Sequence, residues 1–148
     1  MTTTTPSFRT LDVAECEALL SAHQVGRLAF SFRDRVDIEP IHYVYSEGWI
    51  YGRTSPGTKL RALTYDRLVA FEVDEVDALF SWRSVVVKGT LFVLAPEDDG
   101  PLSRVWEQAV FQLQRIVPAA FTAADPTPER TIIFRIQADQ ITGRQAIS

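Results

Sequence analysis

The sequence predicts a mainly β protein of the α+β class, built as a small antiparallel barrel with helices packed outside it. Apolar and polar residues alternate along several runs, and short polar turns separate these runs. Strands joined by short turns pair as antiparallel hairpins. Gly89 interrupts the longest run, and a glycine inside a long strand allows the sharp bend that a closing sheet needs.

Length and composition indicate one domain with a sizeable core. The chain has 148 residues, of which 46% are hydrophobic, and its net charge is -4. An acidic chain is a poor partner for phosphate backbones, so we expect no nucleic-acid binding. The single cysteine, Cys16, gives no disulfide framework and no cysteine metal site.

The chain shows neither the order of a signal peptide nor an apolar run that could cross a membrane. We therefore expect a cytoplasmic protein with no membrane partner. Residues 1–8 are expected to be a flexible tail, and residues 9–148 a single domain.

The first half of the chain reads as one helix followed by three strands. Residues 11–22 have apolar residues at helical spacing. Residues 25–32, 36–45 and 49–53 are strand-like, and the last two form a hairpin around a glycine turn. Pro40 cannot donate a ladder hydrogen bond, so its strand is expected at an edge or a bulge.

The second half alternates helices with longer strands. A short helix over residues 59–66 precedes strands at 68–76 and 82–95. A longer helix starts at Pro101 and ends before Pro118, and residues 119–130 are expected to be a loop. Residues 131–144 give one or two closing strands. Glu72 and Asp74 share one strand face, which we interpret as an exposed polar face.

The turn before the short helix carries an unusual density of anion-binding groups. It combines two cations, three hydroxyls, a proline and a glycine: Arg53, Thr54, Ser55, Pro56, Gly57, Thr58 and Lys59. With Ser55 as N-cap and Pro56 in the first turn, free N–H groups would face an anion. Arg53 and Lys59 would add charge, and the whole set suits a terminal phosphate. The alternative is an ordinary capped helix with solvated cations.

An ordered set of segments resembles the FMN-binding split-barrel superfamily, the pyridoxamine 5'-phosphate oxidase-like proteins. The segments are VGRLAF, IEPIHYVY, GWIYGRTSPGTKLRAL, LVAFEVDEV, WRSVVVKG and ITGR. The resemblance implies an antiparallel split β-barrel with flanking helices that forms a homodimer, with its cofactor at the subunit interface. The nitroimidazole-resistance-like flavoproteins look nearest, although they commonly carry a histidine where this chain has Tyr51-Gly52-Arg53.

The resemblance also implies where FMN would bind. The phosphate would contact residues after the third strand, and the ring would lie along the second strand and at the start of the long strand. The implied cofactor residues are Glu39, Pro40, Ile41, His42, Arg53, Thr54, Ser55, Thr58, Lys59, Trp82 and Ser84. No residue is assigned as catalytic, and His42 is the candidate for that role. A strand histidine satisfied by a backbone partner is the plainer interpretation.

The resemblance implies a flavin-dependent oxidoreductase that acts on a small molecule. Pyridoxamine phosphate oxidase activity is not expected, because QADQITGRQAIS lacks the substrate-phosphate arginines of that enzyme. The alternatives are a deazaflavin-dependent reductase and a non-catalytic protein that binds flavin, or haem through His42. Two histidines without a nearby cysteine give no metal site.

Overall fold

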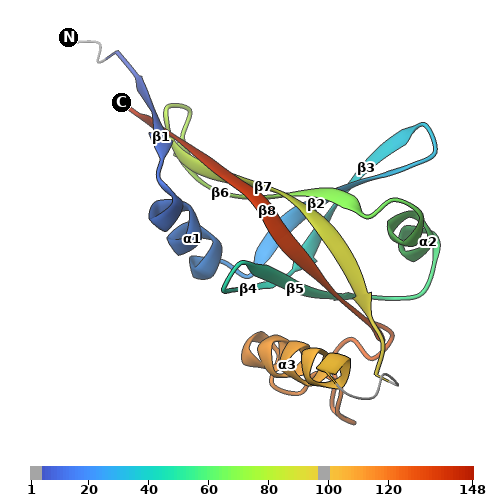
Figure 1. Cartoon of the computed structure of the whole chain (residues 1–148). Helices are drawn as coiled ribbons and strands as arrows, with labels where there is room; N and C mark the ends of the chain where they lie inside the picture. Colours follow the sequence, from blue (N-terminus) through green and yellow to red (C-terminus); the bar gives the residue numbers. More distant parts are fainter. Residues whose placement is uncertain (1–4, 97–100) are drawn as a thin grey trace.

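The computed structural model describes residues 5–96 and 101–148, which form three helices and eight strands (Figure 1). The helices are α1 (Val13–Ala22), α2 (Thr58–Tyr65) and α3 (Pro101–Ile116). The strands are β1 (Ser7–Leu11), β2 (Val25–Phe32), β3 (Arg35–His42), β4 (Val44–Ser46), β5 (Trp49–Thr54), β6 (Leu68–Ala78), β7 (Ser81–Leu94) and β8 (Ile132–Ile147). None of the described helices is long and apolar enough to cross a membrane.

The strands form one antiparallel sheet that curls into an open, split barrel, which confirms the predicted fold class. Their order is β3-β2-β6-β7-β8-β5-β4, and β1 pairs with the far half of β8. The long strands β7 and β8 cross the whole molecule, and the three helices lie outside the sheet (Figure 1). Since β3 ends the strand order, Pro40 lies on an edge strand, as predicted.

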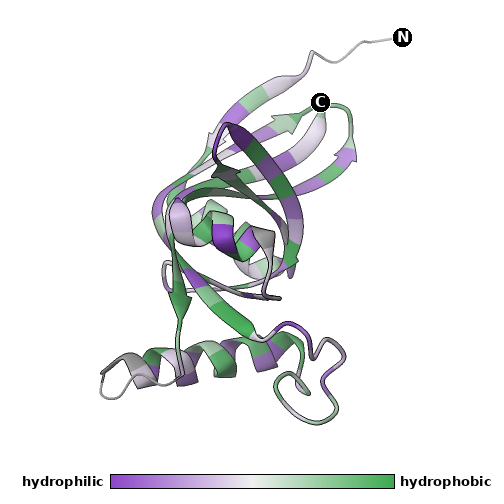
Figure 2. Cartoon of the chain, turned by 90° about the vertical axis from the view of Figure 1, so that its right-hand side faces the viewer, coloured by the Kyte–Doolittle hydropathy of each residue, from purple (hydrophilic) through white to green (hydrophobic). Residues whose placement is uncertain are grey.

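Two groups of buried side chains hold the fold together. The larger fills the barrel and includes Leu28, Phe71 and Ile136, all essentially inaccessible to solvent. The smaller lies on the other face of β5, where Tyr51 packs with Leu113 of α3. Figure 2 views the barrel from the side of α2, with α3 below it and with apolar and polar residues alternating along the strands. That alternation decides which surroundings each site residue meets.

The long strand β7 carries the predicted irregularity. Its pairing with β8 shifts register between Lys88 and Gly89. A Cβ atom at Gly89 would clash with the carbonyl oxygen of Gln137, so glycine allows the two backbones to approach closely.

Several boundaries differ from the prediction. Ser7 and Phe8, expected in the flexible tail, belong to β1 because they pair with the end of β8, more than 130 residues away. Helix α1 starts only at Val13, since Asp12 and Glu15 form a capping box. The predicted strand 36–45 divides into β3 and β4, and residues 132–144 fall in a single strand, β8.

Candidate functional site

Residues that are adjacent in the predicted site lie on opposite faces of the sheet. Thr54 and Ile50 are four residues apart on β5, so their side chains point to the same face of the sheet. Ile50 belongs to the barrel core, and Thr54 is buried. Arg53 and Tyr51 point to the opposite face of β5, where Tyr51 packs against α3. On β3, Ile41 is part of the barrel core, so His42 points outward. The turn and strand β3 therefore place some predicted site residues toward the barrel interior and others on the outer face of the sheet.

The turn before α2 ends in a helix without a side-chain cap. The predicted N-cap at Ser55 is wrong, because α2 begins at Thr58 and its N-cap is Gly57. Gly57 has φ 156, a conformation that side chains disfavour, and no side chain donates or accepts at the cap. Among the side chains that the structure describes, none caps the first backbone N–H groups of α2. The side chain of Thr58 lies outside the described part of the chain.

Lys59 and Glu39 bring the turn and strand β3 together. The Lys59 Nζ atom lies 2.8 Å from Glu39 Oε2. The lysine side chain is only 15% exposed, whereas the glutamate is 43% exposed. Two predicted site residues that are twenty positions apart are therefore in contact, and a largely buried cation lies in the first turn of α2.

Arg53 faces away from the turn and holds the loop that follows α3. Its guanidinium donates four hydrogen bonds, to both carboxylate oxygens of Asp125 and to the backbone oxygens of Thr127 and Arg130. The ring of Phe121 lies 4.2 Å from its Cζ. Four of the five N–H donors of an arginine are thus used within the chain. Arg53 therefore differs from the expected phosphate contact, because the loop already occupies its donors.

Asp125 organises the same loop. Its carboxylate also accepts from the backbone N–H groups of Phe121 and Thr127, at 2.8 and 3.0 Å. The hydrogen bonds from Arg53, and then those from the backbone, hold the pKa of Asp125 well below its usual range. The sequence predicted only a loop over residues 119–130. The Asp125-Pro126 pair, followed by Thr127, was the local signal for an aspartate-capped turn.

His42 lines a pocket between the sheet and α3. Its Nδ1 atom is 3.4 Å from Nη1 of Arg130. The pocket has a volume of about 270 Å³ and is lined by residues of β3, β5, α3 and the following loop: His42, Arg53, Leu113, Ile116, Val117, Ala120, Pro126, Thr127 and Arg130. His42 thus contacts a charged side chain rather than a backbone partner.

Trp82 and Ser84 lie apart from the other predicted site residues within one chain. Pro40 pairs with Arg27, Arg27 with Glu72, and Glu72 with Val86, so this row of paired residues spans three strand spacings. At about 4.8 Å per spacing, the β3 end of the row is about 14 Å from β7. Ser84 is two residues beyond that row. Along the curled sheet, two strands therefore separate the predicted residues of β3 from those of β7.

A carboxyl pair occupies the surface between those strands. Arg27 Nη1 lies 3.4 Å from Glu72 and 3.5 Å from Asp74. Burial, and then the hydrogen bond and the charge of Asp74, raise the pKa of Glu72 to about 7. The predicted polar face is therefore more than a solvated surface, since Glu72 can gain or lose a proton near neutral pH.

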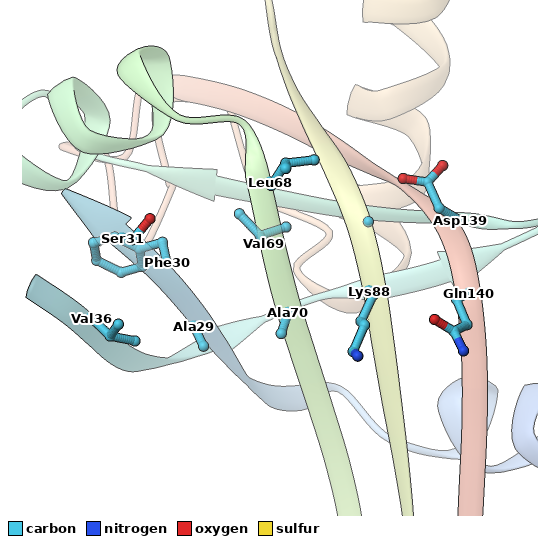
Figure 3. A pocket seen from close by; sticks show the side chains of 11 residues that line it. Ala29, Phe30, Ser31, Val36, Leu68, Val69, Ala70, Lys88, Asp139 and Gln140 are labelled. Atoms are coloured by element: carbon cyan, nitrogen blue, oxygen red, sulfur yellow. The ribbon is translucent and has the colours of Figure 1, made fainter. Parts of the chain in front are cut away.

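A second hollow lies across the outer face of the sheet, with a volume of about 450 Å³. Figure 3 shows side chains of β2, β3, β6, β7 and β8 around it, including Ala29, Val36, Leu68, Ala70 and Lys88. Val36 and Leu68 are 81% and 69% exposed. This groove is an exposed apolar surface on an otherwise acidic protein.

Comparison with known proteins agrees with this fold. The chain is similar to an FAD-binding protein from Mesorhizobium loti, with 28% identity and a TM-score of 0.75 over 97% of this chain and 100% of that one. It is also similar to an FAD-binding protein from Mycobacterium smegmatis, with 26% identity and a TM-score of 0.65 over 93% and 98% of the two chains. A Bacteroides thetaiotaomicron structure named for 5-nitroimidazole antibiotic resistance has the same fold, at 16% identity and a TM-score of 0.70 over 100% of this chain and 98% of that one.

The match to a family model covers nearly the whole chain. Residues 12–145 match the model described as pyridoxamine 5'-phosphate oxidase, which spans every element except β1 and the end of β8. The chain therefore belongs to the pyridoxamine 5'-phosphate oxidase family.

Proposed function

We propose that the protein is a cytoplasmic flavoprotein that binds FMN noncovalently and transfers electrons to or from a small molecule. The family supports the flavin, and the turn before α2 supports the phosphate. When bound, a flavin supplies hydride and electron transfer, and the protein supplies binding and orientation.

One observation carries this proposal: the buried cation at the uncapped start of α2. Lys59 is held in the first turn of α2, next to backbone N–H groups that none of the described side chains caps. A helix N-terminus and a lysine together favour a phosphate. A Cβ atom at Gly57 would meet nothing within 4 Å, so the turn is open to an approaching ligand. The residues present thus fit a phosphate, with Lys59 and the α2 N–H groups in place of Arg53.

The outer face offers two groups for proton transfer to or from a substrate. His42 is the candidate catalytic residue. The guanidinium of Arg130 can only donate a hydrogen bond, so Nδ1 of His42 accepts it and the neutral ring carries its proton on Nε2. That Nε2–H group is the one available for proton transfer. Glu72 is the second, since its pKa of about 7 allows both protonation states at neutral pH.

We also propose that the protein works as a homodimer with the cofactor at the interface. Trp82 and Ser84 lie on β7, three strand spacings from β3 along the sheet, and in a dimer a second copy would supply them to the site. The apolar groove around Val36 and Leu68 is a suitable interface. Val36→Asp should convert the dimer into monomers in light scattering without changing the fold, and an unchanged mass would exclude this face.

FAD is the second candidate for the cofactor, because two solved relatives are named as FAD-binding. Titrations of the protein with riboflavin, FMN and FAD, followed by flavin fluorescence, distinguish the two. If the turn holds the phosphate, FMN should bind at least about tenfold more tightly than riboflavin. Equal affinities for FMN and riboflavin would contradict the phosphate site, and a clear preference for FAD over FMN would contradict the FMN assignment.

A further inference from the structure

We propose that the pocket beside α3 binds a small organic carboxylate, with its acid group on Arg130 and His42 and its apolar body between α3 and the loop. The pocket lies on the outer face of β5, opposite the face that carries Thr54. The inference concerns a second ligand site and does not depend on flavin binding.

The charge of the pocket favours one negative charge on the ligand. Two arginines line it, Arg53 and Arg130. Arg53 is neutralised by Asp125 through two carboxylate contacts, the shorter of 2.7 Å. Arg130 takes part in none of the ion pairs found among residues 5–96 and 101–148, and its side-chain partner is the imidazole of His42. The pocket thus has one uncompensated positive charge.

The geometry of that charge favours a carboxylate. A guanidinium presents a planar fork that matches the two oxygens of a carboxylate. With Arg130 donating to Nδ1, the neutral ring of His42 carries its proton on Nε2 and has a further donor to offer. One guanidinium balances a monoanion, whereas a phosphate dianion would keep an excess charge.

The walls and the size limit the rest of the ligand. Five of the nine lining residues are aliphatic: Leu113, Ile116, Val117, Ala120 and Pro126. Apolar walls with a few polar groups are typical of small-molecule sites. The volume of about 270 Å³ is below the usual range for larger ligands, so a single ring or a short branched chain fits best.

The test is a calorimetric titration of the full chain with benzoate, with benzyl alcohol as the uncharged probe. We expect saturable binding of benzoate that is at least about tenfold tighter than that of benzyl alcohol. Arg130→Gln should remove that preference, and Val117→Phe, which fills the pocket, should abolish binding. Arg35→Gln is the matched control, because it removes an exposed arginine at the start of β3 and should leave binding unchanged.

Three results would overturn the proposal. The first is the absence of saturable benzoate binding. The second is an Arg130→Gln variant that binds benzoate as tightly as the wild type does. The third is displacement of benzoate by FMN, which would assign the pocket to the flavin. The titration without flavin reports on the pocket alone. A protein that fails to bind FMN but binds benzoate through Arg130 would disprove the proposed function and not this inference.

Discussion

Replacing Lys59 should weaken flavin nucleotide binding, whereas replacing Arg53 should weaken the fold. Both residues flank the same turn and both are cations. Lys59 lies in the first turn of α2, beside free backbone N–H groups. Arg53 donates its hydrogen bonds to Asp125 and the loop after α3. The variants Lys59→Met and Arg53→Met keep most of each side chain's bulk and remove its charge.

The expected loss of affinity follows from two opposing contributions. A charge-assisted contact with a phosphate is worth about 1.5–3 kcal/mol. The ion pair that Lys59 makes with the half-exposed Glu39 is worth at most about 1 kcal/mol, and phosphate binding would displace it. Subtracting the full contribution of about 1 kcal/mol leaves a net loss of about 0.5–2 kcal/mol in Lys59→Met, which is about a two- to thirtyfold weaker affinity for FMN.

The assay is a fluorescence titration with FMN, with riboflavin as the ligand that lacks the phosphate. Lys59→Met should change the affinity for FMN and leave that for riboflavin nearly unchanged. Glu39→Gln removes the ion pair of Lys59, so the affinity of this variant for FMN should equal or exceed that of the wild type. Arg53→Met should lower the midpoint of thermal unfolding and, where it stays folded, bind FMN as the wild type does. The reasoning is refuted if Lys59→Met binds FMN normally while folded Arg53→Met does not.

Three further outcomes follow from buried polar contacts. The pKa of Asp125 is lowered in the folded state, so the ionised carboxylate contributes fully to stability above its ordinary pKa of 3.8, and this contribution is lost as the pH falls below that value. Asp125→Asn should therefore lower the free energy of unfolding at pH 7. The variant should also show a smaller decline of that free energy in acid. The pKa of Glu72 is about 7 in the folded chain against an ordinary 4.5, so the unfolded chain loses the carboxyl proton at a lower pH. The free energy of unfolding should therefore fall as the pH rises from 4.5 to 7. Denaturation of Glu72→Gln across that range should show no such fall. The buried Tyr43 hydroxyl donates to the carbonyl oxygen of Leu20, and Tyr43→Phe should cost about 1–3 kcal/mol in urea denaturation, while an unchanged midpoint would show that the carbonyl finds another donor.

The local signals in the sequence predicted most strands and helices correctly. Alternation identified β2, β5, β6 and β7, and each of these strands packs one face into the barrel. Pro40 indicated an edge strand because proline lacks an N–H donor, and Gly89 indicated a bulge because glycine has no Cβ atom to keep the backbones apart. These features depend on a few neighbouring residues, so a single sequence carries them.

Features that depend on distant partners were not predictable in this way. Strand β1 forms because Ser7–Leu11 finds the end of β8, and nothing in its own residues indicates that pairing. Arg53 was expected at a phosphate, but its partner Asp125 lies 72 positions further along the chain. By contrast, Lys59 and Glu39, both expected at one site, do meet. The family resemblance implied the site residues as a set, and the fold divides them between the two faces of the sheet and among strands β3, β5 and β7.

The central claim, that this chain holds a flavin nucleotide, is tested most directly by the absorbance spectrum of the purified protein, with mass spectrometry of the molecule released by heat. We expect flavin absorbance bands and the mass of FMN. The mass of FAD would keep the flavin and change the nucleotide. A Soret band, a deazaflavin mass, or a colourless protein that does not take up added FMN would contradict the claim.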